Sequence, residues 1–186
     1  MQSLQRKLLL FLLFTLGVFA KSEATHIVGG ELYYNYLGND NYQIPLTVYR
    51  DCFNGVPPFD DPAYVGIWDA ANNLIMEVAL SPNDSATVPS IINSPCFQPP
   101  GGICVRVANY YAIVNLPPIP GGYQLAYQRC CRNQTILNVV NPLSTGASFY
   151  AFIPGSGVVN SNPVFSALPP AFICNGYTFT FDHSAT

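Results

Sequence analysis

The chain is 186 residues long, 9% of its residues are charged, and its formal net charge is −3. At roughly 100 to 200 residues per domain, this length allows one domain, or one domain and part of a second, and excludes a large multidomain enzyme. Tyr and Phe occur 12 times each, which excludes an intrinsically disordered chain because such chains lack the residues that bury apolar surface. The 17 prolines and 14 glycines favour strands joined by turns.

Residues 1–24 have the pattern of a secretory signal peptide. Two basic residues precede an apolar run from Leu8 to Ala20, which is shorter than the roughly 20 residues needed to span a bilayer. Small residues at Ala20 and at Ala24 both fit the cleavage rule, so the sequence allows cleavage after either residue. The pattern predicts a secreted or cell-surface protein with no membrane insertion after the signal is removed.

The charge of the remaining chain excludes one class of partner. Without residues 1–24 there are four arginines, no lysine and nine acidic residues, so the formal net charge is about −5. A protein that binds nucleic acid needs a basic surface to neutralise phosphates, and four scattered arginines do not provide one. We therefore expect no nucleic-acid partner.

Residues 25–154 have the pattern of a single all-β domain, because apolar and polar residues alternate in short runs that turn-forming residues separate. This spacing predicts an immunoglobulin-like β-sandwich. The predicted strands run from Ile27 to Leu37, Tyr42 to Arg50, Tyr64 to Trp68, Leu74 to Leu80, Val105 to Leu116, Tyr123 to Arg132, Ile136 to Val140, Ser148 to Ile153 and, beyond this domain, Tyr177 to Phe181.

Two of these strands show which face points into the core. Successive side chains of a strand point to opposite faces, so residues two apart share a face. The faces predicted to be buried are Tyr42, Ile44, Leu46, Val48 and Cys52 in one strand, and Tyr123, Leu125, Tyr127 and Cys131 in another.

The composition changes after residue 154. Gly, Pro, Ser and Asn dominate from Gly155 to Pro170, as in linkers, and the apolar run from Tyr177 to Phe181 comes after them. We expect 155–186 to be a linker and the first strand of a truncated second β module. The run from Tyr177 is alternatively the last strand of the first sandwich.

The six cysteines predict a set of disulfides, because an even number in an exported chain is typical of oxidised pairs. A turn-forming sequence between Cys96 and Cys104 favours a bond that closes a short loop. Alternation directs Cys52 and Cys131 into the core and Cys130 to the opposite face. The predicted pairs are therefore Cys96–Cys104, Cys52–Cys131 and, by exclusion, Cys130–Cys174.

No set of residues predicts catalysis, a cofactor or a metal. The segment 27–30, Ile-Val-Gly-Gly, matches the start of mature trypsin-like proteases, but the chain contains no Gly-Asp-Ser-Gly-Gly segment, and His183 lies three residues from the chain end. Asp51, Asp60 and Asp61 are candidates for calcium binding or acid/base chemistry, but acidic residues in a Pro-rich loop are more often a solvated surface. We expect a protein that is not an enzyme.

Aromatic residues raise a second possibility, because rings with polar tips stack on sugars. In neighbouring strand positions half of them must point inward, so we favour a core role for most. The candidates are Tyr33, Tyr34, Tyr36, Tyr110 and Tyr111.

Several segments together resemble a known family. They are Ala24-Thr-His-Ile-Val-Gly-Gly-Glu31, Leu46-Thr-Val-Tyr-Arg-Asp-Cys-Phe-Asn-Gly55, Leu116-Pro-Pro-Ile-Pro-Gly-Gly-Tyr123, Tyr127-Gln-Arg-Cys-Cys-Arg-Asn133 and the end of the chain from Phe179 to Thr186. They are similar to the N-terminal region of large Bacteroidota surface proteins, which are associated with gliding motility, secreted by the type IX system and carry PKD-type modules. The Tyr-Arg-Asp-Cys and Arg-Cys-Cys-Arg-Asn segments are the most specific.

The resemblance implies a non-catalytic structural or adhesive module whose partners are other domains of the same long protein, and surface glycans or proteins. It also implies that 181–186 open a PKD- or cadherin-like module, and that Asp84-Ser85-Ala86 is an O-glycosylation acceptor modified at Ser85. The alternative function is a carbohydrate-binding module of a secreted polysaccharide-degrading system. That alternative predicts an exposed, coplanar row of Tyr or Trp.

Overall fold

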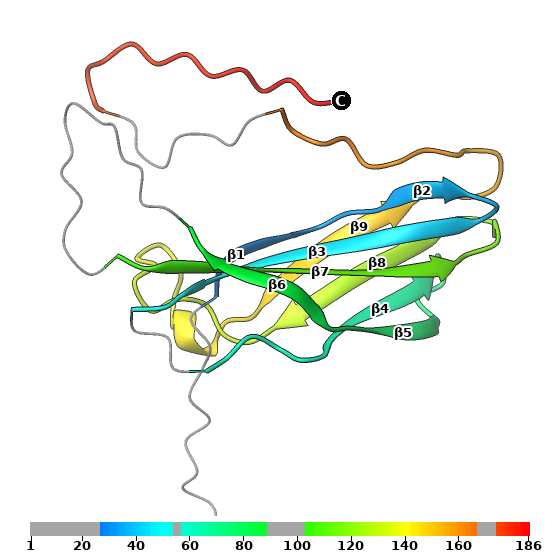
Figure 1. The fold of residues 1–186 in the computed structure, drawn as a ribbon, viewed down its shortest axis with the longest axis horizontal. Helices are drawn as coiled ribbons and strands as arrows, with labels where there is room; N and C mark the ends of the chain where they lie inside the picture. The colour runs from blue at the N-terminus through cyan, green and yellow to red at the C-terminus, as the bar shows by residue number, and fades with distance from the viewer. Residues whose placement is uncertain (1–26, 54–56, 89–102, 167–173) are drawn as a thin grey trace, which may run out of the picture.

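The structure is a computed structural model that describes residues 27–53, 57–88, 103–166 and 174–186 (Figure 1). The predicted signal peptide and Cys96 lie outside the described residues. Two antiparallel sheets face each other and enclose one apolar core, so the predicted all-β sandwich is confirmed. The strand bounds reproduce most of the predicted ones to within a residue or two.

The first sheet has the order β1-β3-β7-β6, and β2 also pairs with β3. Its centre is the ladder between β3 and β7, which runs without a break from Asn41 opposite Asn115 to Asp51 opposite Val105. This eleven-residue antiparallel ladder uses the backbone groups on one edge of each strand, and the opposite edges pair with β1 and β2 in the case of β3 and with β6 in the case of β7. The strands are β1 (Ile27–Leu32), β2 (Asn35–Gly38), β3 (Asn41–Asp51), β6 (Pro82–Thr87) and β7 (Val105–Asn115).

The second sheet has the order β5-β4-β8-β9, so β5 and β9 are its edges. The register places Gly66 opposite Ala126 and Ala126 opposite Tyr150, which brings β4, β8 and β9 into one continuous surface. The strands are β4 (Ala63–Asp69), β5 (Leu74–Leu80), β8 (Tyr123–Arg129) and β9 (Ala147–Ile153).

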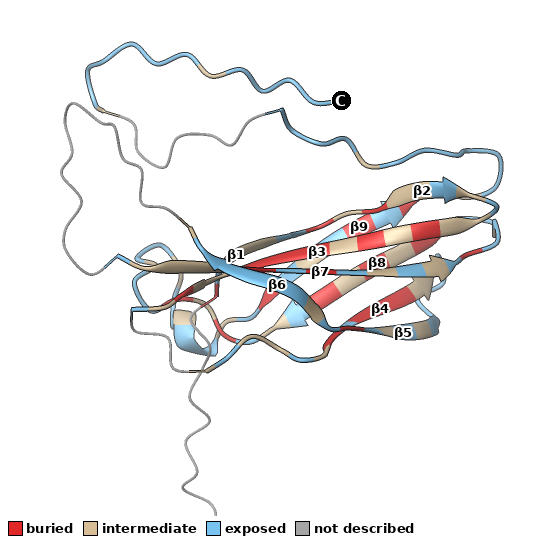
Figure 2. Cartoon of the chain, viewed as in Figure 1, coloured by how far each residue is buried: buried red, intermediate tan, exposed pale blue. Residues whose placement is uncertain are grey.

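The core lies between the inner faces of the two sheets (Figure 2). The faces predicted from alternation are confirmed for β3 and β8, where Leu46 and Leu125 are both 0% exposed. Burial of a large aliphatic side chain contributes about 1.5–3 kcal/mol, so these two faces supply much of the stability of the sandwich. The confirmed residues are Tyr42, Ile44, Leu46, Val48, Tyr123, Leu125 and Tyr127.

The strand predictions fail in three places within the first domain. The predicted strand from Ile27 to Leu37 is divided, because β1 ends at Leu32 and β2 begins at Asn35. Strand β6 was not predicted, because its sequence Pro-Asn-Asp-Ser-Ala-Thr is polar; it lies at a sheet edge and is largely exposed.

The predicted strand from Ile136 to Val140 is wrong. Asn133 starts a turn here, since its side chain accepts a 3.1 Å hydrogen bond from the Thr135 amide and its carbonyl accepts one from Ile136. Strand β8 already pairs with β4 and β9, so no free edge beside it remains. Leu137 is 98% exposed as a result.

The chain after β9 returns to the first sheet. The backbone amide of Tyr34 donates to Asn162 Oδ1 at 2.9 Å, and the Asn162 amide donates to the Tyr34 carbonyl at 3.0 Å. The Tyr36 amide donates to Ser161 Oγ at 2.9 Å. Part of the predicted linker therefore covers the polar groups of β2 and the residues before it.

The predicted strand from Tyr177 to Phe181 is wrong, because these residues belong to no ladder. The end of the chain instead pairs with the segment after Asn162. Val164 and Thr186 exchange two backbone hydrogen bonds of 2.8 and 3.0 Å, and Phe165 forms an isolated antiparallel bridge with Ala185. The run from Tyr177 is therefore not the last strand of the first sandwich.

Candidate functional site

Four cysteines, Cys52, Cys104, Cys130 and Cys131, lie at the end of the sandwich where β3 ends and β7 begins, and this region is named the cysteine end. Cys52 bonds to Cys104, with a Cα–Cα distance of 5.0 Å. Asp51 and Val105 are the last register pair, so the next residue on each strand faces the other, and the Cys52 amide donates to the Cys104 carbonyl at 2.9 Å. The predicted pairs Cys96–Cys104 and Cys52–Cys131 are therefore wrong.

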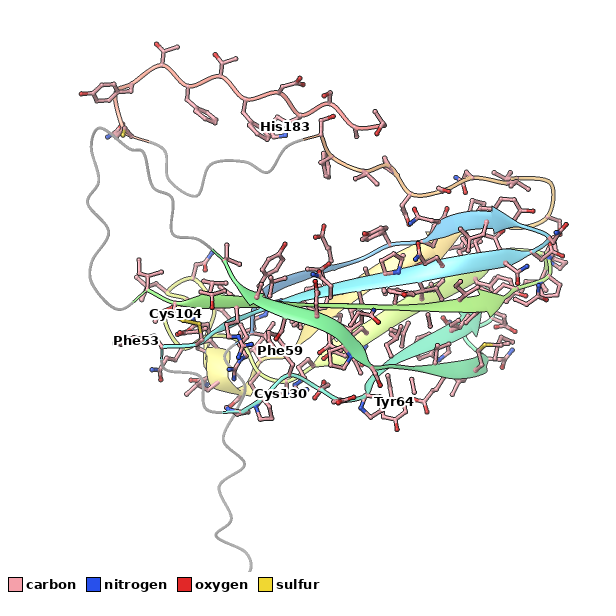
Figure 3. The ribbon with its side chains drawn as sticks, in the orientation of Figure 1. Phe53, Phe59, Tyr64, Cys104, Cys130 and His183 are labelled. Atoms are coloured by element: carbon pink, nitrogen blue, oxygen red, sulfur yellow. A yellow bond between two sulfur atoms is a disulfide. The ribbon has the colours of Figure 1, made fainter. Side chains whose placement is uncertain are left out.

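The second disulfide joins the neighbouring residues Cys130 and Cys131, so the predicted pair Cys130–Cys174 is also wrong. The prediction assumed that β8 continues through both cysteines, but β8 ends at Arg129 and strand alternation no longer applies. Cys131 is buried, as predicted, whereas Cys130 is exposed. Figure 3 shows Cys130 and Cys104 at the same end of the molecule. Cys174 is also disulfide-bonded.

Asp51 and Asp60 are structural residues of the cysteine end, and they do not form the acidic cluster that the sequence suggested. The Asp51 carboxylate accepts hydrogen bonds from the Phe53 amide at 2.8 Å and from Asn133 Nδ2 at 3.5 Å. Asp61 is exposed. Among the residues that the structure describes, no group of three or more His, Cys, Asp or Glu side chains could hold a metal ion.

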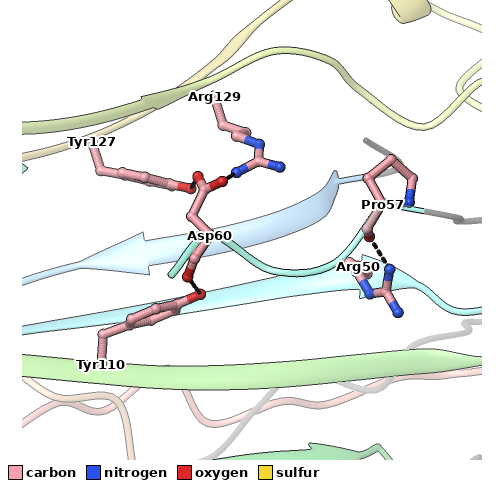
Figure 4. A network of polar contacts seen from close by, with 6 residues as sticks. All are labelled: Arg50, Pro57, Asp60, Tyr110, Tyr127 and Arg129. Atoms are coloured by element: carbon pink, nitrogen blue, oxygen red, sulfur yellow. Dashed lines mark hydrogen bonds and ion pairs between the residues drawn. The ribbon is translucent and has the colours of Figure 1, made fainter. Parts of the chain in front are cut away.

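Asp60 is the centre of a polar network between the sheets (Figure 4). Its carboxylate forms an ion pair with Arg129 and accepts a 2.6 Å hydrogen bond from the Tyr127 hydroxyl. Its backbone carbonyl accepts a 3.0 Å hydrogen bond from the Tyr110 hydroxyl. Tyr110 belongs to the first sheet and Tyr127 to the second, so this one residue ties the loop before β4 to both sheets.

Burial changes the acidity of this network. Desolvation raises the pKa of Tyr110 to about 12 and raises the pKa of Tyr127 further, because the phenolate form loses its hydration. Desolvation also lowers the pKa of Arg129. Both hydroxyls therefore stay neutral donors at physiological pH, which is the form that the Asp60 oxygens require.

Arg50 holds the same loop at a second point. Its guanidinium donates to the Pro57 carbonyl and lies 5.3 Å from the centre of the Phe59 ring, within the range of a cation–π contact. Two of the four arginines outside the signal peptide thus fix the loop between β3 and β4.

Ser85 lies exposed on the edge strand β6, between Asp84 and Ala86, which are also exposed. Its hydroxyl oxygen accepts a 2.7 Å hydrogen bond from Arg106 on the neighbouring strand. The residue that the resemblance implies as a modification site is thus at the surface.

The five candidate tyrosines divide between core and surface, as alternation required. Tyr34 and Tyr110 are each 2% exposed and belong to the core, and Tyr36 packs against the core. Tyr33 is half-buried, and Tyr111 is 51% exposed on the outer side of β7. These residues do not form a single exposed row.

An aromatic surface lies instead on the outer side of the second sheet. Strands β4, β8 and β9 direct alternate residues outward there, and Tyr64 at the start of β4 is 56% exposed, outside the two sheets (Figure 3). We name this surface the Trp68 face. It comprises Tyr64, Trp68, Asn72, Gln124, Ala126, Gln128 and Tyr150, and all except Tyr64 line a shallow open hollow of about 270 Å³.

Gly66 fixes how Trp68 lies on this face. A Cβ atom at Gly66 would come within 2.0 Å of the Trp68 Cη2 atom and 2.6 Å of two further ring carbons. The six-membered ring of the indole therefore covers Gly66, in space that any side chain at that position would fill. Trp68 also lines the hollow.

The Trp68 face is not among the sites predicted from the sequence, although the sequence contains signals for it. Trp68 is the single tryptophan of the chain and stands two residues after a glycine in a predicted strand. A glycine inside a strand often marks the close approach of another group. The register that adds Gln124 and Tyr150 comes from strands distant in sequence, and no local pattern contains it.

No protein-family model, curated protein or solved structure matches this chain. Within the described ranges, no helix is long and apolar enough to cross a membrane. The Cys52–Cys104 and Cys130–Cys131 disulfides are typical of proteins that fold in an oxidising compartment.

Proposed function

We propose that the chain is a non-catalytic extracellular adhesion module of a bacterial surface protein. The observation that carries the proposal is the Trp68 face, an open surface of a disulfide-bonded sandwich that combines the partly buried Trp68 with the exposed Tyr150 and with amide side chains. Exposed aromatic residues with few polar groups of fixed position are characteristic of binding surfaces. The polar clusters of the cysteine end, in contrast, hold loops in place.

The export pattern of residues 1–24 and the disulfides support the extracellular location. Disulfides persist in secreted and surface proteins and are rare in the cytosol. The resemblance to type IX-secreted, gliding-motility-associated proteins supports a place at the N-terminus of a longer chain. Its partners would then be the later domains of the same protein.

The alternative function is a carbohydrate-binding module of a secreted polysaccharide-degrading system, and the aromatic rings of the Trp68 face favour it as well. The two functions differ in the domains expected on the C-terminal side of the sandwich. An adhesion protein continues into further β modules and a sorting domain, whereas a degrading system places a catalytic domain in the same chain or beside it.

The reading frame downstream of Thr186 tests the architecture first. We expect an acidic stretch, further β modules and a C-terminal sorting domain. A catalytic domain in that frame would instead support the alternative.

In-frame deletion of residues 25–154 from the parent gene tests the function. We expect cells to attach to surfaces several-fold less, with unchanged growth and unchanged export of the rest of the protein. Unchanged attachment, with the deleted protein present at the surface, would contradict the adhesive role.

A further inference from the structure

We infer that the Trp68 face binds a neutral glycan chain, with the sugar ring stacked on Trp68 as the central contact. This inference rests on the proposed function, because it names the ligand class of the adhesion module. Four features of the face lead to it: the orientation of the indole, the amides around it, its charge and its shape.

The indole presents a flat apolar surface of the right kind. Gly66 leaves room for the six-membered ring over the backbone of β4, and Trp68 also lines the hollow. Pyranose rings carry their C–H groups on flat faces, and these bury apolar surface when they stack on an aromatic ring. Tyr150, 56% exposed, adds a second ring on the far strand of the hollow.

Primary amides surround the rings. Gln124 and Gln128 reach the hollow from β8, and Asn72 reaches it from the turn between β4 and β5. A primary amide carries two donor N–H groups and one acceptor oxygen, and Gln124 Nε2 already uses one donor on the Asp69 carbonyl at 3.5 Å. The other groups match sugar hydroxyls, which both donate and accept hydrogen bonds. A hydrophobic peptide or a lipid surface would leave these amide groups unsatisfied, and that costs binding free energy.

The charge of the second sheet selects a neutral glycan over an acidic one. Of the residues in β4, β5, β8 and β9, the one cation is Arg129, and it pairs with Asp60 on the inner side. Glu77 is the register partner of Gly66, so its carboxylate lies on the same side of the sheet as the Trp68 face. Sulfate or uronate groups would meet this carboxylate without a compensating cation.

The shape of the hollow fits the side of a chain, because the hollow is open and shallow and does not enclose its contents. It runs across the strands from Trp68 on β4, past Gln124 and Gln128 on β8, to Tyr150 on β9. Two strand spacings separate β4 from β9, which is about 10 Å. A glycan of several sugar units would therefore contact both rings.

Tryptophan fluorescence gives a direct test, since Trp68 is the single tryptophan of the chain. The oxidised, signal-free chain is titrated with neutral probes, namely xyloglucan, galactomannan, and cello-, xylo- and chito-oligosaccharides, and with polygalacturonate as the acidic probe. We expect a saturable change in Trp68 emission with at least one neutral probe and none with polygalacturonate.

Variants then assign the contact by isothermal titration calorimetry with the neutral probe that binds. Trp68→Ala and Tyr150→Ala should each weaken binding at least tenfold. Gly66→Ala keeps the indole but displaces it from the sheet, so it should weaken binding as well. Tyr111→Ala removes a similarly exposed ring from the other sheet and should leave affinity unchanged. Circular dichroism confirms that each variant is folded.

Three results would overturn the inference: no binding of any neutral probe, equal binding of polygalacturonate, or an effect of Tyr111→Ala as large as that of Tyr150→Ala. The proposed function fails separately. If the 25–154 deletion reduces cell attachment but Trp68→Ala in the parent gene does not, the adhesion module stands and the glycan contact is refuted. If the deletion has no effect while the probes bind, the ligand is correct and the adhesive role is refuted.

Discussion

At the cysteine end a disulfide joins β3 to β7, whereas at the opposite end a backbone hydrogen bond of 2.8 Å, from the Leu116 amide to the Asp40 carbonyl, holds the same two strands together. We name the opposite end, formed by residues 38–41, 69–73 and 116–122, the turn end. The two ends close the same sandwich with different chemistry.

The hairpin turns at 38–41 and 69–73 of the turn end are built from local sequence, although the Leu116–Asp40 bond joins distant residues. Asn39 and Asp40 have φ values of 50° and 60°, as in the tight two-residue turns that match the twist of a hairpin. The Asp69 carboxylate accepts hydrogen bonds from the amides of Ala71 and Asn73 and from the Asn73 side chain, and these bonds lower the pKa of Asp69. Each turn is complete within a few residues.

The cysteine end is built from residues far apart in the chain. Asp60 contacts Tyr110, Tyr127 and Arg129, and Asp51 contacts Asn133, across separations of 50 to 82 residues. Substitutions at the cysteine end should therefore lower the free energy of global unfolding, whereas substitutions at the turn end should change it little.

The largest effect is expected from Cys52→Ala combined with Cys104→Ala. The bond spans 52 residues, so its loss frees a long loop in the unfolded chain and should lower the free energy of unfolding by about 4 kcal/mol. Urea unfolding of the oxidised proteins measures it. Cys130→Ala with Cys131→Ala is the matched control and should cost about 1 kcal/mol, because a bond between neighbours constrains little chain. Equal losses would contradict this account.

Asp60→Asn comes next. The substitution removes the negative charge of the carboxylate that pairs with Arg129 and that accepts the hydrogen bond of the Tyr127 hydroxyl. It should lower the free energy of unfolding by about 2–3 kcal/mol. Asp61→Asn changes the exposed neighbouring carboxylate and should shift stability by less than about 0.5 kcal/mol. Chemical denaturation compares the two; a smaller loss for Asp60→Asn than for Asp61→Asn would show that the network is not structural.

Alkaline pH should weaken the cysteine end through its tyrosines. The folded pKa of Tyr110, about 12, is above the unfolded value near 10, so its contribution is complete below pH 10 and is lost as the pH rises from 10 to 12. The expected slope is about 1.4 kcal/mol per pH unit from this group. Urea midpoints between pH 8 and 11 measure the slope. Tyr110→Phe should reduce it and Tyr111→Phe should not; identical slopes for both would contradict the assignment.

The smallest effects belong to the turn end. Asp40→Ala puts a side chain without polar groups at φ 60° and should cost about 1 kcal/mol, whereas Asp40→Gly should be neutral or slightly stabilising. Thermal unfolding of the two variants measures the difference. If Asp40→Ala lost as much stability as the double variant Cys52→Ala, Cys104→Ala, the two ends would not differ in their contribution to stability.

The same division explains which features the sequence predicted. Alternation in β3 and β8 identified Leu46 and Leu125 as core residues, because that rule depends on neighbouring residues alone. The partner of Cys52 depends on the register of β3 against β7, whose paired residues lie tens of positions apart. The pairing of Cys130 depends on where β8 ends. Neither property is present in a local pattern.

The residues of the candidate site were likewise not predictable from local patterns, because they are distant from one another in the sequence. The sequence drew attention to clusters of tyrosines and aspartates because they are adjacent in the chain, and the fold separated them between core, surface and loop. The Trp68 face joins residues from β4, β8 and β9, so only the sheet brings them together.

The Cys52–Cys104 bond also sets how far the module can lengthen when it is pulled. A fully extended chain spans at most 3.3–3.6 Å per residue, so the 52-residue separation between these cysteines withholds roughly 170–190 Å of chain from extension. Under tension the segment at 160–162 can separate from β2 by losing a few hydrogen bonds, whereas β4, β5 and β6 lie inside the closed loop. Two strands of the second sheet, β4 and β5, thus stay on the part of the chain that the disulfide shields from extension.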